Sequence, residues 1–152
     1  MPDTKTVPKK GAAHGAGKKA APTKELPPLA TAAVVAGFPS PAEQYAENPL
    51  DLNELMVRNA PATFYVRVSG DSMLGAGILN GDILVVDKSL QAQGNDIVIA
   101  SVNGEFTVKF LRKRGAKISL EAANPAYKPI VFTSEMELQV WGVVTGLVRK
   151  FA

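Results

Sequence analysis

The 152-residue sequence has no cysteine and a single histidine, His14. Without cysteine the chain cannot form a disulfide framework, use a thiol nucleophile or hold a metal through thiolates. One histidine cannot build a multi-histidine metal site, and its isolation argues against a Ser-His-Asp triad. We therefore expect no metal and no other cofactor.

Long apolar runs are also missing. A membrane-spanning helix needs about 18 consecutive apolar residues, and no segment reaches that length. The short run LATAAVVAG (29–37) follows a basic segment, as in a secretory signal. However, it is short and rich in alanine, and Pro27 and Pro28 precede it, which favours an extended segment instead. No contact with a membrane is expected.

The net charge of +3 is unevenly distributed along the chain. Residues 1–36 contain six lysines against Asp3 and Glu25, a net charge of +4, whereas residues 37–152 contain 11 basic and 12 acidic residues, a net charge of −1. The basic segment is rich in alanine, proline and glycine and shows no apolar period. It cannot bury enough surface to offset its conformational entropy, so it is predicted to be a flexible arm up to about residue 28.

The rest of the chain is predicted to be all-β, a compact and strongly bent fold of short strands. Asp51 and Glu54 resemble an N-terminal capping box, which predicts one short helix near 51–58. Alternating or continuous apolar runs bounded by turn residues predict the strands. These are expected at 64–69, 83–87, 97–102, 105–111, 117–121, 130–133 and 136–149.

Asn103-Gly104 predicts a two-residue hairpin, because a type I′ turn requires positive φ at both positions. The turn sets a register in which Val98 faces Lys109. Lys109 then shares a largely apolar face with Leu111. Two interpretations of this lysine remain open: its ammonium group extends to water, or burial lowers its pKa until it can act as a general base.

A lysine base would most naturally serve a serine or threonine nucleophile. The glycine-rich loop SGDSM (69–73) contains Ser72, beside Gly70, which permits a sharp turn. The hydroxyl could be a nucleophile with backbone donors nearby, or it could simply cap the turn. Elsewhere, Arg112-Lys113-Arg114 is predicted to be a solvated hairpin tip and Asp82 a turn former.

Four segments together resemble the LexA/UmuD family of self-cleaving proteins, serine peptidases of the S24 type. They are GFPSPAEQY (37–45), VSGDSM (68–73), GILNGDILVVD (77–87) and EFTVKFL (105–111). The resemblance extends over about residues 34–149 and implies the LexA/signal-peptidase fold, which is β-clip-like. It implies that Ser72 is the nucleophile and Lys109 the general base. The backbone N–H groups of Asp71 and Ser72 would form the oxyanion hole.

The same resemblance implies a serine endopeptidase that cuts its own Ala36–Gly37 bond, with Val34 and Val35 anchoring the substrate segment. Residues 1–36 would be the arm that is removed, and residues 37–152 the peptidase and dimerisation domain. The implied partners are a second copy of the chain, the RecA–single-stranded DNA filament and a UmuC-like Y-family polymerase. The setting would be cytoplasmic SOS mutagenesis, in which the product supports translesion synthesis.

Departures from the family leave alternatives. Only 36 residues without helical periodicity precede Gly37, so a sequence-specific repressor is not expected. The lysine-rich stretch at 5–24 is either a solvating tail or a weak, salt-sensitive contact to nucleic acid. A non-catalytic dimerisation module with a basic DNA-attaching arm is the second hypothesis. A membrane-anchored type I signal peptidase is a third, which the missing span disfavours.

Overall fold

The computed structural model describes residues 25–30, 33, 36–37 and 47–152. The chain divides into two units, Met1–Pro49 and Leu50–Ala152, which we describe separately. In the first unit, strand β1 (Pro28–Ala30) pairs antiparallel with β2 (Glu47–Pro49). The sequence does not predict this pair, because each strand contains a proline and is too short to show a period of two.

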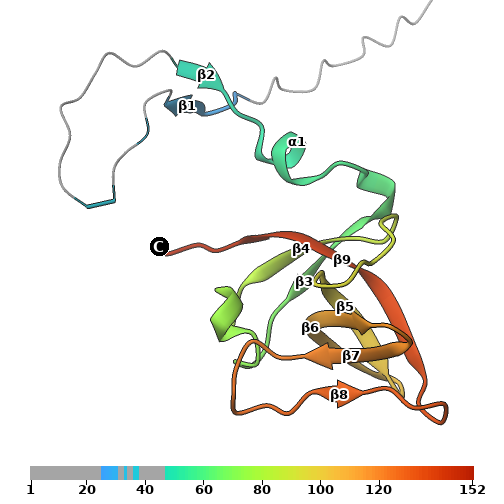
Figure 1. Ribbon diagram of the computed structural model, residues 1–152. Helices are drawn as coiled ribbons and strands as arrows, with labels where there is room; N and C mark the ends of the chain where they lie inside the picture. The colour runs from blue at the N-terminus through green and yellow to red at the C-terminus, as the bar shows by residue number, and fades with distance from the viewer. Residues whose placement is uncertain (1–24, 31–32, 34–35, 38–46) are drawn as a thin grey trace, which may run out of the picture. The chain divides into compact units, whose positions relative to one another are not determined.

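The second unit contains one seven-stranded antiparallel sheet (Figure 1), which confirms the all-β prediction. The strand order is β3-β4-β9-β5-β6-β7-β8. The bounds are β3 (Thr63–Arg67), β4 (Ile83–Asp87), β5 (Ile97–Val102), β6 (Glu105–Arg114), β7 (Lys117–Glu121), β8 (Ile130–Val131) and β9 (Leu138–Val148). These agree with the predicted strands to within a few residues at each end.

Strand β9 joins the two halves of the sheet. It pairs with β5 through its first half and with β4 through its second half. Each pairing shifts by one residue, between Ile99 and Ala100 of β5 and between Val85 and Val86 of β4. The extra residues on β9 are Trp141 and Thr145. Such bulges bend a strand and increase its twist, which accounts for the bent sheet expected from the sequence.

The β5–β6 hairpin has the register predicted from its turn. Val98 lies opposite Lys109, and Val102 opposite Glu105. Asn103 and Gly104 have φ values of +49° and +86°, in the left-handed region that a type I′ turn requires. Local turn chemistry alone therefore determines which face of β6 carries Lys109.

The predicted helix is present but short. Helix α1 (Leu52–Met56) begins after Asp51, whose carboxylate accepts a hydrogen bond of 2.7 Å from the N–H of Asn53. Asp51 is therefore the N-cap, as expected, but its carboxylate bonds to the N–H of Asn53 instead of the N–H of Glu54 that a capping box uses. Two single-turn 3₁₀ helices, η1 (Ala60–Ala62) and η2 (Leu74–Ala76), complete the elements. Within the described ranges, no helix has the length and apolar character that a membrane crossing requires.

Two clusters of buried side chains lie on opposite faces of β5. Ile99 belongs to the first cluster, whereas Val98 and Ala100 belong to the second. The remaining buried members of the first cluster are Val68, Met73, Ile78, Leu84 and Val86. Those of the second are Leu111 and Leu120. Because β5 is covered on both faces, its sequence is a continuous apolar run rather than an alternating one.

Candidate active site

Lys109 lies in the middle of β6, and only 9% of its surface is exposed. Its neighbour across the hairpin, Val98, is completely buried. The amine is therefore held among apolar neighbours, as one of the two interpretations of the sequence expected. A lysine in such a place needs polar partners for its Nζ atom.

Ser72 lies on the loop between β3 and β4, and we call residues 69–77 the nucleophile loop. Gly70 has φ = +99°, which only glycine adopts readily, and its N–H donates to the side chain of Asn80 at 2.9 Å. Directly after Ser72, Met73 is 1% exposed and packs into the first core cluster. The loop is thus fixed on both sides of the serine.

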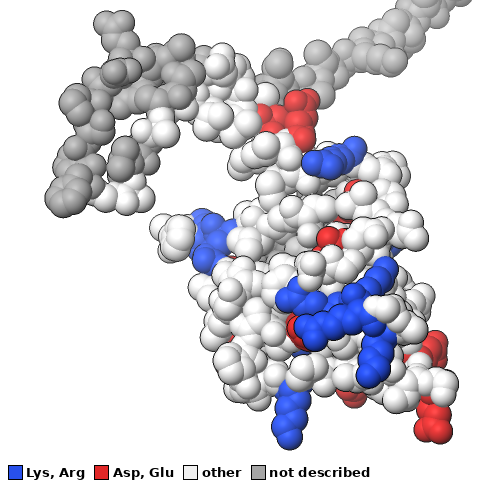
Figure 2. All heavy atoms as spheres, viewed as in Figure 1, with Lys and Arg blue, Asp and Glu red and all other residues white. Residues whose placement is uncertain are grey.

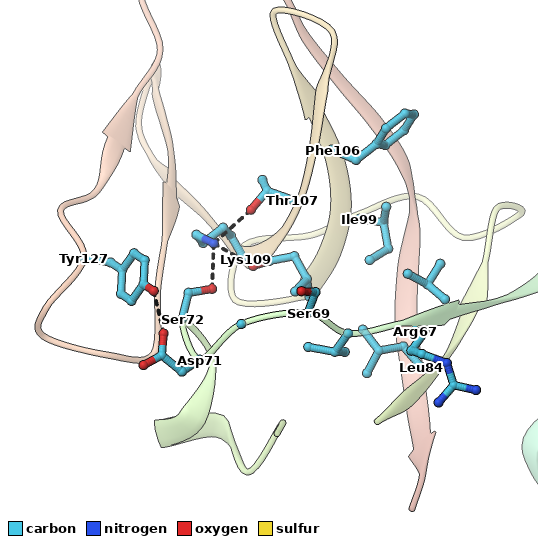
Figure 3. Close-up of a pocket in the computed structure, with 14 residues that line it drawn as sticks. Arg67, Ser69, Asp71, Ser72, Leu84, Ile99, Phe106, Thr107, Lys109 and Tyr127 are labelled. Atoms are coloured by element: carbon cyan, nitrogen blue, oxygen red, sulfur yellow. Dashed lines mark hydrogen bonds between the residues drawn. The ribbon is translucent and has the colours of Figure 1, made fainter. Parts of the chain in front are cut away.

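The Nζ atom of Lys109 has three hydrogen-bond partners (Figure 3). It lies 2.8 Å from Ser72 Oγ, 2.9 Å from Thr107 Oγ1 and 3.1 Å from the carbonyl oxygen of Val108. A charged ammonium donates to all three. A neutral amine donates to two of them, Thr107 and Val108, and its lone pair then faces the hydroxyl of Ser72. The geometry therefore suits an amine that receives a proton from Ser72.

Burial lowers the pKa of Lys109 below its ordinary value of 10.5. The cause is desolvation, which disfavours the charged ammonium. A lowered pKa enlarges the fraction of neutral amine near physiological pH, and only the neutral amine can act as a base. Both the position of Lys109 and its lowered pKa therefore favour a role as general base.

Backbone donors lie beside the serine. Among the described residues, neither the N–H of Asp71 nor that of Ser72 donates to a protein acceptor. Two successive free N–H groups next to a nucleophile are what oxyanion stabilisation requires. The sequence pointed to the same two groups through the family resemblance.

The dyad opens into a cleft with a volume of about 380 Å³. Figure 3 shows Ser72, Lys109 and Tyr127 at one side of this cleft, and the side chains of Leu84, Ile99 and Phe106, together with Arg67, at the other. Phe106 is 64% exposed, so the rim of the cleft carries an accessible aromatic ring. The cleft can therefore take an extended peptide with apolar side chains next to the reacting bond.

The other predicted site residues lie in the first unit. Ala36 and Gly37 are exposed, and a side chain built on Gly37 would meet no atom within 4 Å. Val34 and Val35 lie outside the described residues. The structure thus brings Ser72, Lys109 and Asp71 together within the second unit, while the two units are described separately.

Sequence reasoning missed three polar neighbours of the dyad. Thr107 lies two residues before Lys109 and therefore on the same face of β6, but the sequence pattern assigns it no role. Asn124 is followed by Pro125, which indicates only a break between strands, and no motif singles out Tyr127. Both come from a segment about 50 residues beyond the serine, with separations of 53 and 56 residues from Asp71. No local pattern signals such contacts.

The cationic residues before Gly115 lie at the turn of the β6–β7 hairpin, as expected, but they differ in exposure. They are the last residues of β6, and Figure 2 shows basic side chains gathered over β6 and β7. Arg112 pairs with Glu121 at 3.0 Å, and the amine of Lys113 donates to the carbonyl of Ala92 at 2.8 Å. Arg114 remains exposed, with 82% of its side-chain surface accessible. The prediction of a solvated tip is therefore confirmed for Lys113 and Arg114, which are exposed, and wrong only for Arg112, whose side chain is 27% exposed.

Asp82 is more than a turn former. It accepts a hydrogen bond from the N–H of Leu79 at 2.7 Å, as a turn residue does, but it is also only 3% exposed. Arg149 forms two bonds to its carboxylate, of 2.7 and 2.6 Å. These bonds lower the pKa of Asp82 to about 2. In the ranges that the structure covers, no group of three histidine, cysteine or acidic side chains is arranged to bind a metal.

Comparison with known proteins gives consistent similarities. Residues 28–145 match the family described as Peptidase S24-like. Protein SamA of Salmonella typhimurium is 47% identical over 129 residues, which cover 85% of this chain and 89% of that protein. Protein ImpA of Escherichia coli is 44% identical over 121 residues (76% and 78%), and protein MucA of Escherichia coli is 43% identical over 114 residues (74% and 77%).

Proposed function

The chain belongs to the Peptidase S24-like family, and from this premise we propose that it is a self-cleaving serine endopeptidase that cuts its own Ala36–Gly37 bond. The observation that carries the proposal is the 2.8 Å contact between Lys109 Nζ and Ser72 Oγ in a site that lowers the pKa of the amine. In this proposal residues 1–36 are the removable arm, and residues 37–152 are the peptidase and dimerisation domain.

In the first half of the reaction, Ser72 Oγ attacks the carbonyl carbon of Ala36. Its proton passes to the neutral amine of Lys109, which becomes an ammonium. The carbonyl oxygen becomes an oxyanion, and the N–H groups of Asp71 and Ser72 stabilise it. The bond between Ala36 and Gly37 then breaks, and Lys109 returns its proton to the nitrogen of Gly37.

The second half regenerates the serine. A water molecule attacks the ester between Ser72 and Ala36, and Lys109 accepts a proton from that water. When the ester bond breaks, the proton returns to Ser72 Oγ. The products are a carboxylate at Ala36 and an amine at Gly37, so a net of one water molecule is consumed.

The proposed substrate segment fits the chemistry of the cleft. Alanine and glycine at positions 36 and 37 allow an extended backbone to approach the serine closely. We assign Val34 and Val35 as apolar anchors, which the apolar side of the cleft suits. Because enzyme and substrate belong to one chain, an intramolecular reaction needs no encounter step, so a dyad without a third residue suffices.

The biological setting in this proposal rests on the resemblance to the LexA/UmuD family. The RecA–single-stranded DNA filament stimulates cleavage in the cytoplasm, and the product is a homodimer that serves a UmuC-like Y-family polymerase in SOS mutagenesis. Cleavage would separate an arm with a net charge of +4 from a body with a net charge of −1. Any weak contact between the arm and nucleic acid would end at that step.

The test is to incubate the purified full chain over a range of pH and to measure the products by mass spectrometry. We expect a fragment that begins at Gly37. Its rate of formation should rise with pH to a plateau, and the midpoint of this pH–rate profile should lie below 10.5. RecA, single-stranded DNA and ATP should accelerate its formation. Ser72→Ala and Lys109→Ala should each lower the rate by at least about 1,000-fold. Cleavage that persists in either variant would exclude the dyad.

A further inference from the structure

The connection between β7 and β8 holds the nucleophile loop from one side, and we call residues 123–127 the brace segment. The side-chain amide of Asn124 donates to the carbonyl oxygen of Asp71 at 3.0 Å. The hydroxyl of Tyr127 donates to the carboxylate of Asp71 at 2.5 Å. The N–H of Gly75 donates to the carbonyl of Ala123 at 2.6 Å. The brace segment thus holds the residue directly before Ser72 at two separate atoms.

The brace segment is ordered by its own hydrogen bonds. The Oδ1 atom of Asn124 accepts from the N–H of Ala126 at 3.0 Å, and the carbonyl of Asn124 accepts from the N–H of Tyr127 at 3.1 Å. These bonds determine the orientation of the Asn124 amide. If it were flipped, its NH₂ would face an N–H donor and its oxygen would face a carbonyl. The donor is therefore directed at Asp71 before any substrate binds.

The carbonyl of Asp71 and the N–H of Ser72 belong to the same peptide group. A trans peptide is planar, and its C=O and N–H point in opposite directions. A hydrogen bond that fixes the carbonyl oxygen on one side therefore fixes the direction of the N–H on the other. That N–H is one of the two free donors beside the nucleophile.

Tyr127 lies beside both Asp71 and the lysine. Its hydroxyl points to the carboxylate of Asp71 (Figure 3), and its ring centre lies 5.9 Å from Lys109 Nζ. The hydrogen bond to Asp71 raises the pKa of Tyr127 above its ordinary value of 10.0. The phenol therefore keeps its proton, and remains a donor, to a higher pH than an ordinary tyrosine does.

We propose that Asn124 and Tyr127 are positioning residues for self-cleavage, which hold the Asp71–Ser72 peptide so that its N–H points at the developing oxyanion. The inference rests on the proposed function above, which it deepens. Both residues act through Asp71 and neither exchanges a proton with the substrate. Loss of these contacts alone should therefore lower the rate at every pH without moving the midpoint of the pH–rate profile, which belongs to Lys109.

The decisive variant is Asn124→Asp, which keeps an acceptor for the N–H of Ala126 but replaces the donor to Asp71 with a second oxygen. We expect its self-cleavage rate on the alkaline plateau to fall about 10–100-fold, somewhat less than for complete loss of an oxyanion donor. Tyr127→Phe keeps the ring and should lower the plateau rate about 3–30-fold. Tyr127→Phe adds no charge and should leave the midpoint unchanged, whereas the new carboxylate of Asn124→Asp should move the midpoint to higher pH, so the rates of this variant are compared on the plateau.

Matched controls separate positioning from charge and stability. Asn53→Asp adds the same charge on helix α1, and Tyr65→Phe removes a hydroxyl from a tyrosine on β3 that is 57% exposed. Both should cleave like the parent chain. A second readout is the rate at which a fluorophosphonate probe labels Ser72, with Ser72→Ala as the blank, because labelling also builds charge on an oxygen beside the serine. It should fall in parallel with cleavage.

The outcomes are distinguishable. If the parent chain neither cleaves itself nor reacts with the probe, the proposed function and this inference both fail. If the parent is active but Asn124→Asp and Tyr127→Phe stay within twofold of it, the positioning role alone is overturned. A rate loss that follows a lower Tm and disappears on cooling, or a shifted midpoint in the uncharged variant Tyr127→Phe, would overturn it as well.

Discussion

The amine of Lys109 lies 2.8 Å from the hydroxyl of Ser72, although 37 residues separate the two in the sequence. Their elements are not neighbours, because β4, β9 and β5 lie between β3 and β6 in the sheet. In a flat sheet, four strand spacings would put β3 and β6 about 19 Å apart. The bend at the β9 bulges and the loop after β3 together close this gap.

The first prediction is that Lys109→Met abolishes self-cleavage but stabilises the fold at neutral pH. The folded-state pKa of Lys109 lies below 10.5, so the unfolded chain binds more protons between the two values, and stability rises with pH through that window. Methionine has no ionisable group, so it removes the free-energy cost of burying the amine at a pH where the unfolded chain carries it as an ammonium. We expect a Tm about 2–6 °C higher at pH 7, a typical gain when a strained functional group is replaced.

The measurement is thermal unfolding of Lys109→Met and Ser72→Ala from pH 6 to 11. Ser72→Ala is the control, because it is equally inactive but keeps the buried amine. The advantage of Lys109→Met over the control should shrink as the pH approaches 10.5. A constant difference at all pH values would contradict the assignment of a buried, desolvated lysine.

The second prediction concerns Thr107, whose hydroxyl accepts a hydrogen bond from Lys109 at 2.9 Å. A bond to the charged ammonium is stronger than one to the neutral amine, so Thr107→Val should lower the pKa of Lys109 further. The midpoint of the pH–rate profile should move to lower pH. The plateau rate should fall about 10-fold, because the lone pair is no longer directed at Ser72. Thr107→Ser should retain the parent midpoint, and a shift to higher pH in Thr107→Val would refute this account.

The third prediction is that Gly75→Ala damages the active site through the backbone. A Cβ atom at this position would lie 2.6 Å from the carbonyl oxygen of Ala123, so the nucleophile loop or the brace segment must move. We expect a loss of about 1–3 kcal/mol in the free energy of unfolding, as for overpacking elsewhere, and slower cleavage. Gly94→Ala is the control, because its Cβ would meet the nearest atom at 3.7 Å. Equal stability of the two variants in urea unfolding would be evidence against the close approach.

The fourth prediction concerns the ion pair between Asp82 and Arg149, whose atoms approach to 2.6 Å. The pKa of Asp82 is lowered from 3.8 to about 2, so its stabilising contribution is complete above pH 3.8 and is lost as the pH falls through 2. Arg149→Gln should lower the Tm by about 5 °C at pH 7, since it leaves a buried carboxylate without its cation. Lys150→Gln should have little effect.

The pH dependence checks the cause. The difference in Tm between the parent and Arg149→Gln should shrink below pH 3.8, because the parent then begins to lose the same interaction. A difference that persists unchanged at pH 2 would show that Arg149 stabilises the fold through its bond to the carbonyl of Gly77 instead.

Much of the second unit was predictable because its signals are local. Asn103-Gly104 determines the hairpin turn, the period of two determines the register, and the register places Lys109 on its face. The resemblance to the LexA/UmuD family then selected Ser72 as the partner of this lysine. The short β1–β2 pair escaped prediction because prolines and short strands leave no periodic pattern.

What the sequence by itself determined is the strands of the second unit and the face of β6 that carries Lys109, since turn residues and apolar periodicity act between neighbours in the chain. Only the tertiary structure decided the order of the strands, the bend of the sheet and the two positioning contacts on Asp71. Those contacts join residues 53 and 56 positions apart. Their reason is geometric: the bent sheet brings distant loops together, and no property of Asn124 or Tyr127 alone could announce that Asp71 lies within hydrogen-bonding distance.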